Sequence, residues 1–482
     1  MRSAVIRLGC GNEARRATAG PRARSVGASL CAYALLGVAL AILCAQAAAN
    51  PAERRLRNGL RIIVKEDRRA PTLVQQVWYR AGSMDESVGT TGVAHVLEHL
   101  MFKGTSSLAS GEFSRRVAEA GGRENAFTAT DHTVYFQQMH RDKLGLAMAL
   151  EADRMANLIV EENEFPPELK VVMEERRLRT DDRPRSLLYE RLMATAFTSH
   201  PYQWPVVGWM GDLQNMTYRD AANWYRRWYA PNNAVVVIVG DVDAREVFRL
   251  AERTYGRLPA RKLPQRKSVL EPPQRGMRQV TVEAPAAQAY VMLGYKVPVL
   301  RRIERDWEPH ALAVLAALLD GGNPSARLNQ SLVRERRVAD HAAAGYNALA
   351  RGPGMFCLEG AVAQGKSAAA LEAALREQVE RIAAEEPSGE ELGRVKTKLV
   401  AQRIYRRDSI FSQAMEIGLL ESAGLTWRDS QRIIDGLRSV SPAQVREVAA
   451  KHFIEDNLTV AVLDPQPLDA RQLRAAVPAL RH

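Results

Sequence analysis

The chain has 482 residues, of which 46% are hydrophobic and 25% are charged, values typical of a soluble globular protein. Its formal net charge is +12, but the first 49 residues alone hold six arginines and a single acidic residue. The remainder is only modestly basic and has no lysine- or arginine-rich run interleaved with aromatic residues, so nucleic-acid binding is not expected.

The first 49 residues have the pattern of a secretory signal peptide. Arginines precede an apolar run over residues 30–45, and small residues allow cleavage after Ala47 or Ala49. We therefore expect an exported, periplasmic protein, or a membrane-anchored one if the leader is not cleaved. Three of the four cysteines lie in the leader, so the mature chain keeps only Cys357 and cannot form an internal disulfide or a cysteine-based metal site.

Helix and strand patterns alternate after the leader. The sequence predicts strands at 60–64, 72–79, 133–136, 234–240 and 289–294, and helices at 92–102, 111–120, 141–158, 166–180, 185–197, 218–228, 244–255 and 310–319.

The second half of the chain looks like a degenerate copy of the first. The helix at 310–319 stands where the helix at 92–102 stands in the first half, and a proline-rich basic segment separates the two halves. We therefore predict a signal peptide at 1–49, a catalytic domain at 50–262, a linker at 263–275 and an inactive domain at 276–482.

The most informative motif lies in the helix at 92–102. His95, Glu98 and His99 are spaced i, i+3 and i+4, so their side chains share one face of a helix. Two histidines in this arrangement can bind one Zn²⁺, and the glutamate can activate a water molecule. The pattern H-x-x-E-H is the inverzincin signature. The alternative is an exposed polar helix face whose histidines have no common role.

A catalytic zinc usually has three protein ligands and one open position. The helix predicted at 166–180 offers Glu168, Glu174 and Glu175 as the third ligand. Glu168 and Glu175 are seven residues apart and share a face, whereas Glu174 points about 100° away. The spacing alone does not decide between the two adjacent acids, and Glu168 could simply stabilise the helix N-terminus.

Taken together, these motifs resemble the M16 metallopeptidases, which include pitrilysin, insulin-degrading enzyme and the mitochondrial processing peptidase. The sequences at 93–105, 125–128 and 229–233 are close to the sequence motifs of that family, and the resemblance covers nearly the whole mature chain. It implies an α+β fold (an α/β sandwich or roll) with two homologous domains, each a mostly antiparallel sheet flanked by helices. This chain is similar to the short bacterial two-domain members.

The resemblance also implies roles for individual residues. The zinc ligands would be His95, His99 and Glu175, with one zinc per chain, and Glu98 would be the general base. Glu168 would be a carboxylate outside the ligand set that orients the site.

A strand containing Asn125, Ala126 and Phe127 would bind an extended substrate by strand addition. Family members also carry an arginine and, seven residues later, a tyrosine in the second domain. Here Arg334 fills the first position, but His341 stands where the tyrosine is expected.

The sequence therefore predicts an exported zinc endopeptidase that cleaves peptides or unfolded segments. The main alternative is a non-catalytic or partner-dependent M16 subunit, since members of the family generally pair as homodimers or with an inactive sister chain. A small-molecule lyase with an H-x-x-E-H helix is less favoured, because such enzymes need a catalytic cysteine and Cys357 lies in the opposite domain.

Overall fold

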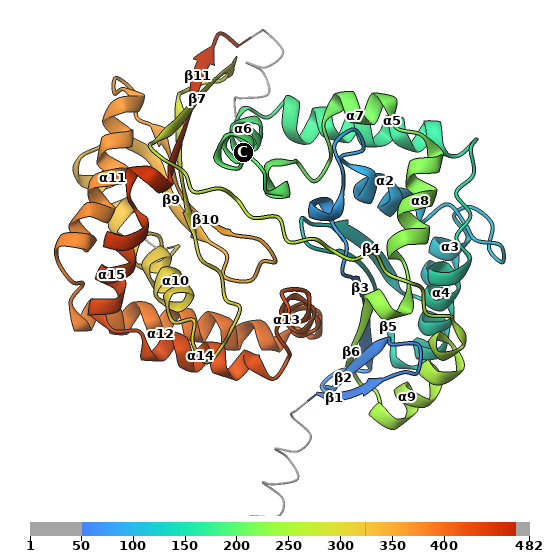
Figure 1. The fold of residues 1–482 in the computed structure, drawn as a ribbon. Coiled ribbons are helices and arrows are strands. Elements are labelled where there is room, and N and C mark those ends of the chain that lie inside the picture. Colours follow the sequence, from blue (N-terminus) through green and yellow to red (C-terminus); the bar gives the residue numbers. More distant parts are fainter. Residues whose placement is uncertain (1–50, 323, 469–482) are drawn as a thin grey trace, which may run out of the picture. The chain divides into compact units, whose positions relative to one another are not determined.

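The structure, a computed structural model, describes residues 51–322 and 324–468, and these residues form two β-sheets (Figure 1). The first sheet has the strand order β1-β2-β6-β3-β5-β4, in which β2 and β6 are parallel and all other neighbours are antiparallel. Its strands are β1 (Ala52–Arg55), β2 (Arg61–Glu66), β3 (Thr72–Tyr79), β4 (Arg123–Thr128), β5 (Thr133–His140) and β6 (Ala234–Gly240). The leader predicted at 1–49 lies outside the described residues.

The second sheet has the order β7-β11-β8-β10-β9, in which β7 and β11 are parallel and the other neighbours are antiparallel. Its strands are β7 (Arg278–Pro285), β8 (Tyr290–Val297), β9 (Ala339–Tyr346), β10 (Gly354–Val362) and β11 (Leu458–Gln466). Two mostly antiparallel sheets, each packed with helices, confirm the predicted α+β fold.

Helices fill the connections between the strands. Those of the first half are α2 (Val93–Leu100), α3 (Glu112–Glu119), α4 (Leu144–Asn157), α5 (Phe165–Arg176), α6 (Pro184–Ala196), α7 (Met210–Asn215), α8 (Tyr218–Trp228) and α9 (Ala244–Arg253). Those of the second half are α10 (Glu308–Leu319), α11 (Ala368–Ala384), α12 (Gly389–Tyr405), α13 (Ile410–Ser422), α14 (Asp429–Ser439) and α15 (Pro442–His452). The helices and strands predicted from the sequence are present, with their ends displaced by a few residues.

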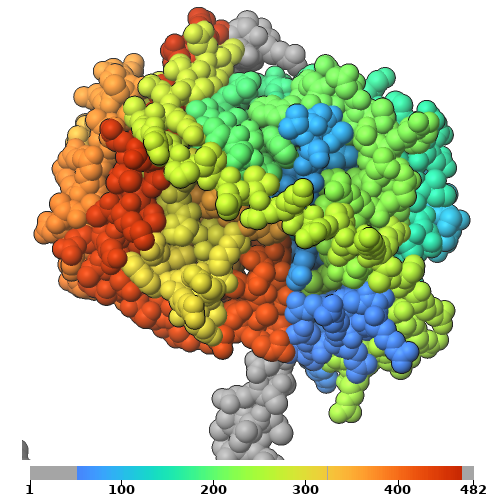
Figure 2. All heavy atoms as spheres, in the orientation of Figure 1, coloured from blue at the N-terminus to red at the C-terminus, as the bar shows by residue number. Residues whose placement is uncertain are grey.

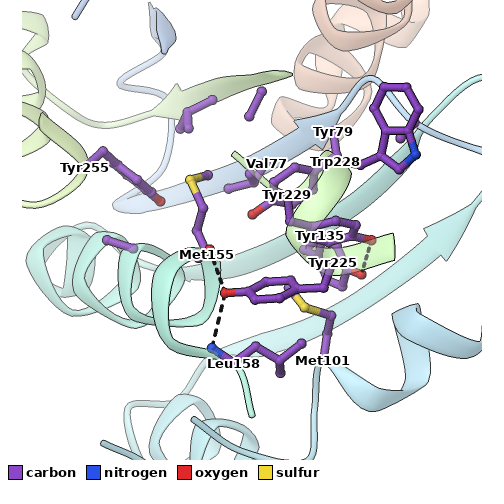
Figure 3. Packing of buried hydrophobic residues seen from close by; sticks show 14 of the residues in the cluster. Val77, Tyr79, Met101, Tyr135, Met155, Leu158, Tyr225, Trp228, Tyr229 and Tyr255 are labelled. Atoms are coloured by element: carbon purple, nitrogen blue, oxygen red, sulfur yellow. Dashed lines mark hydrogen bonds between the residues drawn. The ribbon is translucent and has the colours of Figure 1, made fainter. Parts of the chain in front are cut away.

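Each half has its own apolar core, and the core of the first half holds helix α2 in place. Leu97 and Leu100 of α2 are buried in the same cluster as the tyrosines shown in Figure 3. Within that cluster Tyr79 and Tyr229 stack with ring centroids 4.1 Å apart. The hydroxyl of Tyr229 also lies 2.9 Å from that of Tyr135. Because the apolar side of α2 is fixed in this core, the side that carries the histidines faces away from it.

One helix of each half packs on the sheet of the other half. Helix α6, from the first half, packs on the second sheet, where Leu188 and Leu192 join the cluster that contains Tyr290. Helix α13, from the second half, packs on the first sheet, and Gly418 lies so close to Trp78 that a Cβ atom there would be 1.9 Å from the indole. The described residues from Pro51 onward form one compact unit despite the two sheets.

The segment predicted as a linker, 263–275, contains no helix or strand and lies on the surface, where Figure 2 shows it in yellow-green. Glu271 ties it to the first half, because its carboxylate accepts hydrogen bonds from the backbone N–H groups of Thr198, Ser199 and His200. Among the described residues, no helix is both long enough and apolar enough to cross a membrane.

Buried histidines outside the H-x-x-E-H motif are expected to make the stability of the fold depend on pH. Burial is the main cause that lowers the pKa of His132 and of His200 to about 4 and that also lowers the pKa of His310. Each folded-state pKa lies below the ordinary value of about 6.5, so the unfolded chain takes up protons first as the pH falls. Stability should therefore be intact above pH 6.5 and decrease as the pH falls from 6.5 towards 4.

Urea unfolding measured at pH 7.5 and at pH 5.0 checks this prediction, with a lower midpoint expected at pH 5.0. A His132→Gln variant should show a smaller difference between the two midpoints, because one titrating group has been removed. Equal midpoints for the unmodified protein at the two pH values would contradict the prediction.

Candidate active site

Helix α2 begins at a tight turn that only a glycine allows. Gly92 has φ 90°, and a Cβ atom at this position would lie 2.5 Å from the carbonyl oxygen of Val207. The Glu86 carboxylate accepts hydrogen bonds from the backbone N–H groups of Gly92 and Ala94, at 2.8 and 2.9 Å. These contacts satisfy backbone donors that have no partner within the helix and fix where it starts.

Helix α5 brings a carboxylate to the two histidines of α2. Oxygen Oε2 of Glu175 lies 3.3 Å from Nε2 of His99, and Oε1 lies 3.8 Å from Nε2 of His95. One candidate ligand atom from each of the three residues lies within 4.8 Å of the others. Glu174 points elsewhere and pairs with Arg177, so the geometry selects Glu175 over its neighbour as the third member of the group.

The group fits a zinc ion. Ligands that bind Zn²⁺ at about 2.0–2.1 Å in a tetrahedron are separated from one another by roughly 3.3 Å, close to both distances between Glu175 and the histidines. Burial, together with the nearby charges of His99 and Arg179, lowers the pKa of His95 to about 3, so this ring is neutral, as a ligand must be. Two imidazoles and a carboxylate are a common zinc ligand set.

Glu168 supports the site from about two turns earlier in α5. Its Oε2 lies 3.4 Å from Nδ1 of His99, on the opposite edge of the ring from Glu175. The other carboxylate oxygen of Glu168 forms an ion pair with Lys103. A carboxylate beside the second nitrogen of a metal-binding imidazole fixes the tautomer and the orientation of the ring.

Glu98 is next to the metal-binding group but is not part of it. It is buried, and the hydroxyl of Thr128, on β4, donates a hydrogen bond to Oε2 of Glu98. Burial raises the pKa of Glu98, whereas the Thr128 hydrogen bond and the His99 ring act in the opposite direction. A carboxylate with a raised pKa that is held in one orientation is suited to accept a proton near neutral pH.

A cleft of about 960 Å³ opens in front of these residues. Its walls come from both halves of the chain: β4 contributes Asn125, Ala126 and Phe127, and the second sheet contributes His341 and Glu359. Strand β4 is the last strand of the first sheet, so one of its backbone edges has no partner strand among the described residues. The cleft thus combines a metal-binding group, a buried carboxylate and an open strand edge.

Known proteins of one peptidase family match both halves of the chain. Residues 61–208 match the family Insulinase (Peptidase family M16), and residues 215–399 match the Peptidase M16 inactive domain. The zinc protease PqqE of Helicobacter pylori is 33% identical over 418 residues, which cover 85% of this chain and 92% of that protein. The chain belongs to the M16 peptidase family.

Solved structures extend the match to the whole fold. The crystal structure of a protease from Helicobacter pylori has a TM-score of 0.81 and 31% identity, and the match covers 86% of this chain and 100% of that one. The periplasmic protease PqqL of Escherichia coli has a TM-score of 0.74 at 19% identity, and the match covers 88% of this chain and 49% of that one. The second of these likenesses concerns the fold alone.

The M16 resemblance also predicted a substrate contact from the second half, and here the structure differs from the expectation. Arg334 is exposed in a π-helical turn (Asn329–Glu335) and is not among the residues that line the cleft. His341 does line the cleft, from edge strand β9. Tyr346 lies five residues after His341, but its hydroxyl donates a hydrogen bond to the carbonyl of Pro298 within the second half. A single chain therefore brings His341, and not Arg334, to this M16 site.

Several residues of the site were not assigned a role from the sequence. Thr128 belongs to the segment 125–128 that resembles the family, and Lys103 stands four residues after His99, just past the end of α2. No local signal marks the cleft wall formed by α6, because that wall depends on how α6 packs against the second sheet.

Replacing Glu168 by glutamine should weaken zinc binding by roughly 10- to 100-fold, the range typical for loss of a partner of a metal-binding histidine. Zinc should still bind at saturation, because His95, His99 and Glu175 are unchanged. Competition with a chromogenic chelator measures the affinity. An unchanged affinity would show that Glu168 acts only as an acidic residue in the first turn of α5.

Proposed function

We propose that the protein is a zinc-dependent endopeptidase that hydrolyses peptide bonds in peptides or unfolded segments. The observation that supports this function most strongly is the convergence of His95, His99 and Glu175 beside the buried carboxylate of Glu98. M16 relatives named zinc proteases support the same class of activity. We propose one zinc ion per chain, because the described residues contain one such group of histidines and acids.

The side chains of the site divide the work of hydrolysis between them. A zinc ion held by His95, His99 and Glu175 would polarise the scissile carbonyl and acidify the attacking water. Glu98 would take a proton from that water and deliver it to the amine that leaves. The Thr128 hydroxyl holds Glu98 in the orientation that this transfer requires.

The open edge of β4 supports an extended peptide as the substrate. A peptide that pairs with the backbone of Asn125, Ala126 and Phe127 would lie in the cleft that also contains Glu98. Strand addition requires a segment free of its own secondary structure, so peptides and unfolded segments are favoured over folded proteins. No base-specific or phosphate-binding chemistry is needed, and nucleic acid is not proposed as a partner.

A non-catalytic or partner-dependent subunit is the second candidate. It is supported by the match of residues 215–399 to an inactive domain and by the position of Arg334 outside the cleft. The presence of both histidines, Glu98 and Glu175 favours the catalytic role. We propose that the chain pairs with a second copy of itself or with an inactive M16 sister chain.

Export to the periplasm is also proposed, from the pattern of the first 49 residues. The name of the Escherichia coli relative PqqL, a periplasmic protease, agrees with this location. An uncleaved leader would anchor the protein in the membrane.

Hydrolysis of a peptide mixture by the purified protein tests the proposed function. Mass spectrometry should detect internal cleavage products, which should disappear after treatment with a chelator and return when zinc is restored. Cleavage that appears only when a sister chain is added would favour the partner-dependent subunit. Cleavage that is indifferent to the chelator would contradict a zinc-dependent reaction.

A further inference from the structure

Three arginines follow Glu175 closely, and they point in three directions. Arg176 is buried and donates hydrogen bonds to Glu190 at 2.9 Å and to the carbonyl of Gly208 at 2.8 Å. Arg177 pairs with Glu174 on the exposed side of α5. Arg179 turns back towards the metal-binding group. The three side chains therefore have separate environments although they are close in sequence.

Arg179 lies directly beside the candidate zinc ligands. Its Nη1 is 2.6 Å from Oε1 of Glu175, the oxygen that lies 3.8 Å from Nε2 of His95. The side chain is 75% exposed and lines the same cleft as Glu98. An arginine has five N–H donors, and Glu175 is its one hydrogen-bonding or ion-pair partner within the described chain. The remaining donors are available to a molecule in the cleft.

Arg179 lies in an irregular stretch of backbone. Helix α5 ends at Arg176 and continues as a π-helical turn, Arg177–Asp181. The buried contacts of Arg176 hold the start of this turn against α6 and the chain at Gly208. Single π-helical turns are rare, and they occur frequently at functional sites.

No other arginine that lines the cleft is placed in the same way. Arg185 is the second arginine of the described chain on the cleft wall, and its guanidinium lies over the ring of Tyr290, 4.4 Å from the centroid. Arg334 is exposed outside the cleft. Arg179 is thus the cleft arginine in contact with a candidate zinc ligand.

We propose that Arg179 is the oxyanion-binding residue of this site. The inference rests on the proposed hydrolysis. When the water oxygen bonds to the carbonyl carbon, the π electron pair of the carbonyl moves onto its oxygen, and the water proton passes to Glu98. The Arg179 guanidinium donates N–H hydrogen bonds to that negatively charged oxygen. The electron pair on this oxygen then re-forms the carbonyl as the C–N bond breaks, and Glu98 gives its proton to the leaving amine.

The competing explanation is that Arg179 and Glu175 form an ordinary exposed pair at i and i+4. Such pairs have little effect on stability and none on chemistry. Arg177, which pairs with Glu174 three residues earlier, provides a matched control on the same helix. Arg177→Met makes the same change of charge and size as Arg179→Met but outside the cleft.

Binding of acetohydroxamate, a small metal-binding oxyanion, to the zinc-loaded protein tests the proposal independently of hydrolysis. Calorimetry should show its Kd raised about tenfold or more in Arg179→Met, partly restored in Arg179→Lys and unchanged in Arg177→Met. Zinc content should be the same in all four proteins. Equal Kd values in Arg179→Met and the unmodified protein would overturn the proposal, and so would loss of zinc from Arg179→Met, because Arg179 would then serve to hold Glu175.

Kinetics on a cleaved peptide add a second readout. Removal of one oxyanion donor typically lowers kcat by about 10²-fold or more, and we expect this for Arg179→Met with little change in KM. A fall in kcat of less than about threefold would overturn the catalytic part of the proposal. If the unmodified protein cleaves no peptide yet binds acetohydroxamate through Arg179, the proposed hydrolysis fails and the oxyanion site stands.

Discussion

Replacing Glu98 by glutamine is expected to lower peptide hydrolysis by about 10³-fold while zinc remains bound, within the range for loss of a general acid–base group. Glutamine has the same shape as glutamate and can still accept the hydrogen bond from Thr128, but it cannot take a proton from water. None of the three candidate zinc ligands changes. Initial rates on a fluorogenic peptide, together with zinc analysis of the same sample, measure both properties.

Thr128→Val provides a comparison for the Glu98 variant. It removes the hydroxyl that donates to Glu98 but leaves the carboxylate in place, so activity should fall by a smaller factor than in Glu98→Gln. Undiminished turnover by Glu98→Gln would show that Glu98 is not the general base. Loss of zinc from the same variant would instead indicate that Glu98 is a ligand.

Replacing Glu175 by glutamine is expected to weaken zinc binding by more than about 100-fold, the upper end of the range for residues that do not touch the metal. A neutral amide is a poor zinc ligand, and only His95 and His99 would remain as strong ligands. Hydrolysis should be lost together with the zinc. Chelator competition and metal analysis after dialysis give the affinity and the occupancy.

Glu174→Gln is the matched control for this variant, because Glu174 has the same side chain one residue earlier and pairs with Arg177 away from the histidines. It should bind zinc and cleave peptides as the unmodified protein does. The reverse result, with zinc lost from Glu174→Gln and kept by Glu175→Gln, would show that Glu174 and not Glu175 is the third ligand.

The positions of the side chains within α2 and α5 could be predicted from the sequence. The i, i+3, i+4 spacing of His95, Glu98 and His99 requires only a helix, and α2 is a helix of eight residues with its apolar side in the core. The same holds for the relation of Glu168 to Glu175, which share a face of α5. In both cases neighbouring residues and helical geometry are enough to place the side chains.

Features that depend on contacts between distant segments could not be predicted in this way. The pattern of α6 indicates a helix, but it does not tell that its leucines Leu188 and Leu192 pack on the second sheet instead of the first. The packing of α6 on the second sheet builds one wall of the cleft and follows only from the tertiary structure.

Two arginines show that the sequence alone does not tell which charged side chains reach the cleft. A family register placed Arg334 near the substrate, but in this chain its turn leaves it exposed outside the cleft. Arg179 lies in a charged run that reads as a solvated helix face. Its i, i+4 spacing places it beside Glu175, but the local sequence does not tell that the pair faces the cleft.

The central claim is that α2 and α5 together form a zinc site, and an anomalous difference map at the zinc absorption edge tests it most directly. Crystals of the zinc-loaded protein should show one strong peak per chain, about 2.0–2.2 Å from a ring nitrogen of His95, a ring nitrogen of His99 and a carboxylate oxygen of Glu175. Absence of a peak between these three residues, in a sample that contains stoichiometric zinc, would contradict the account.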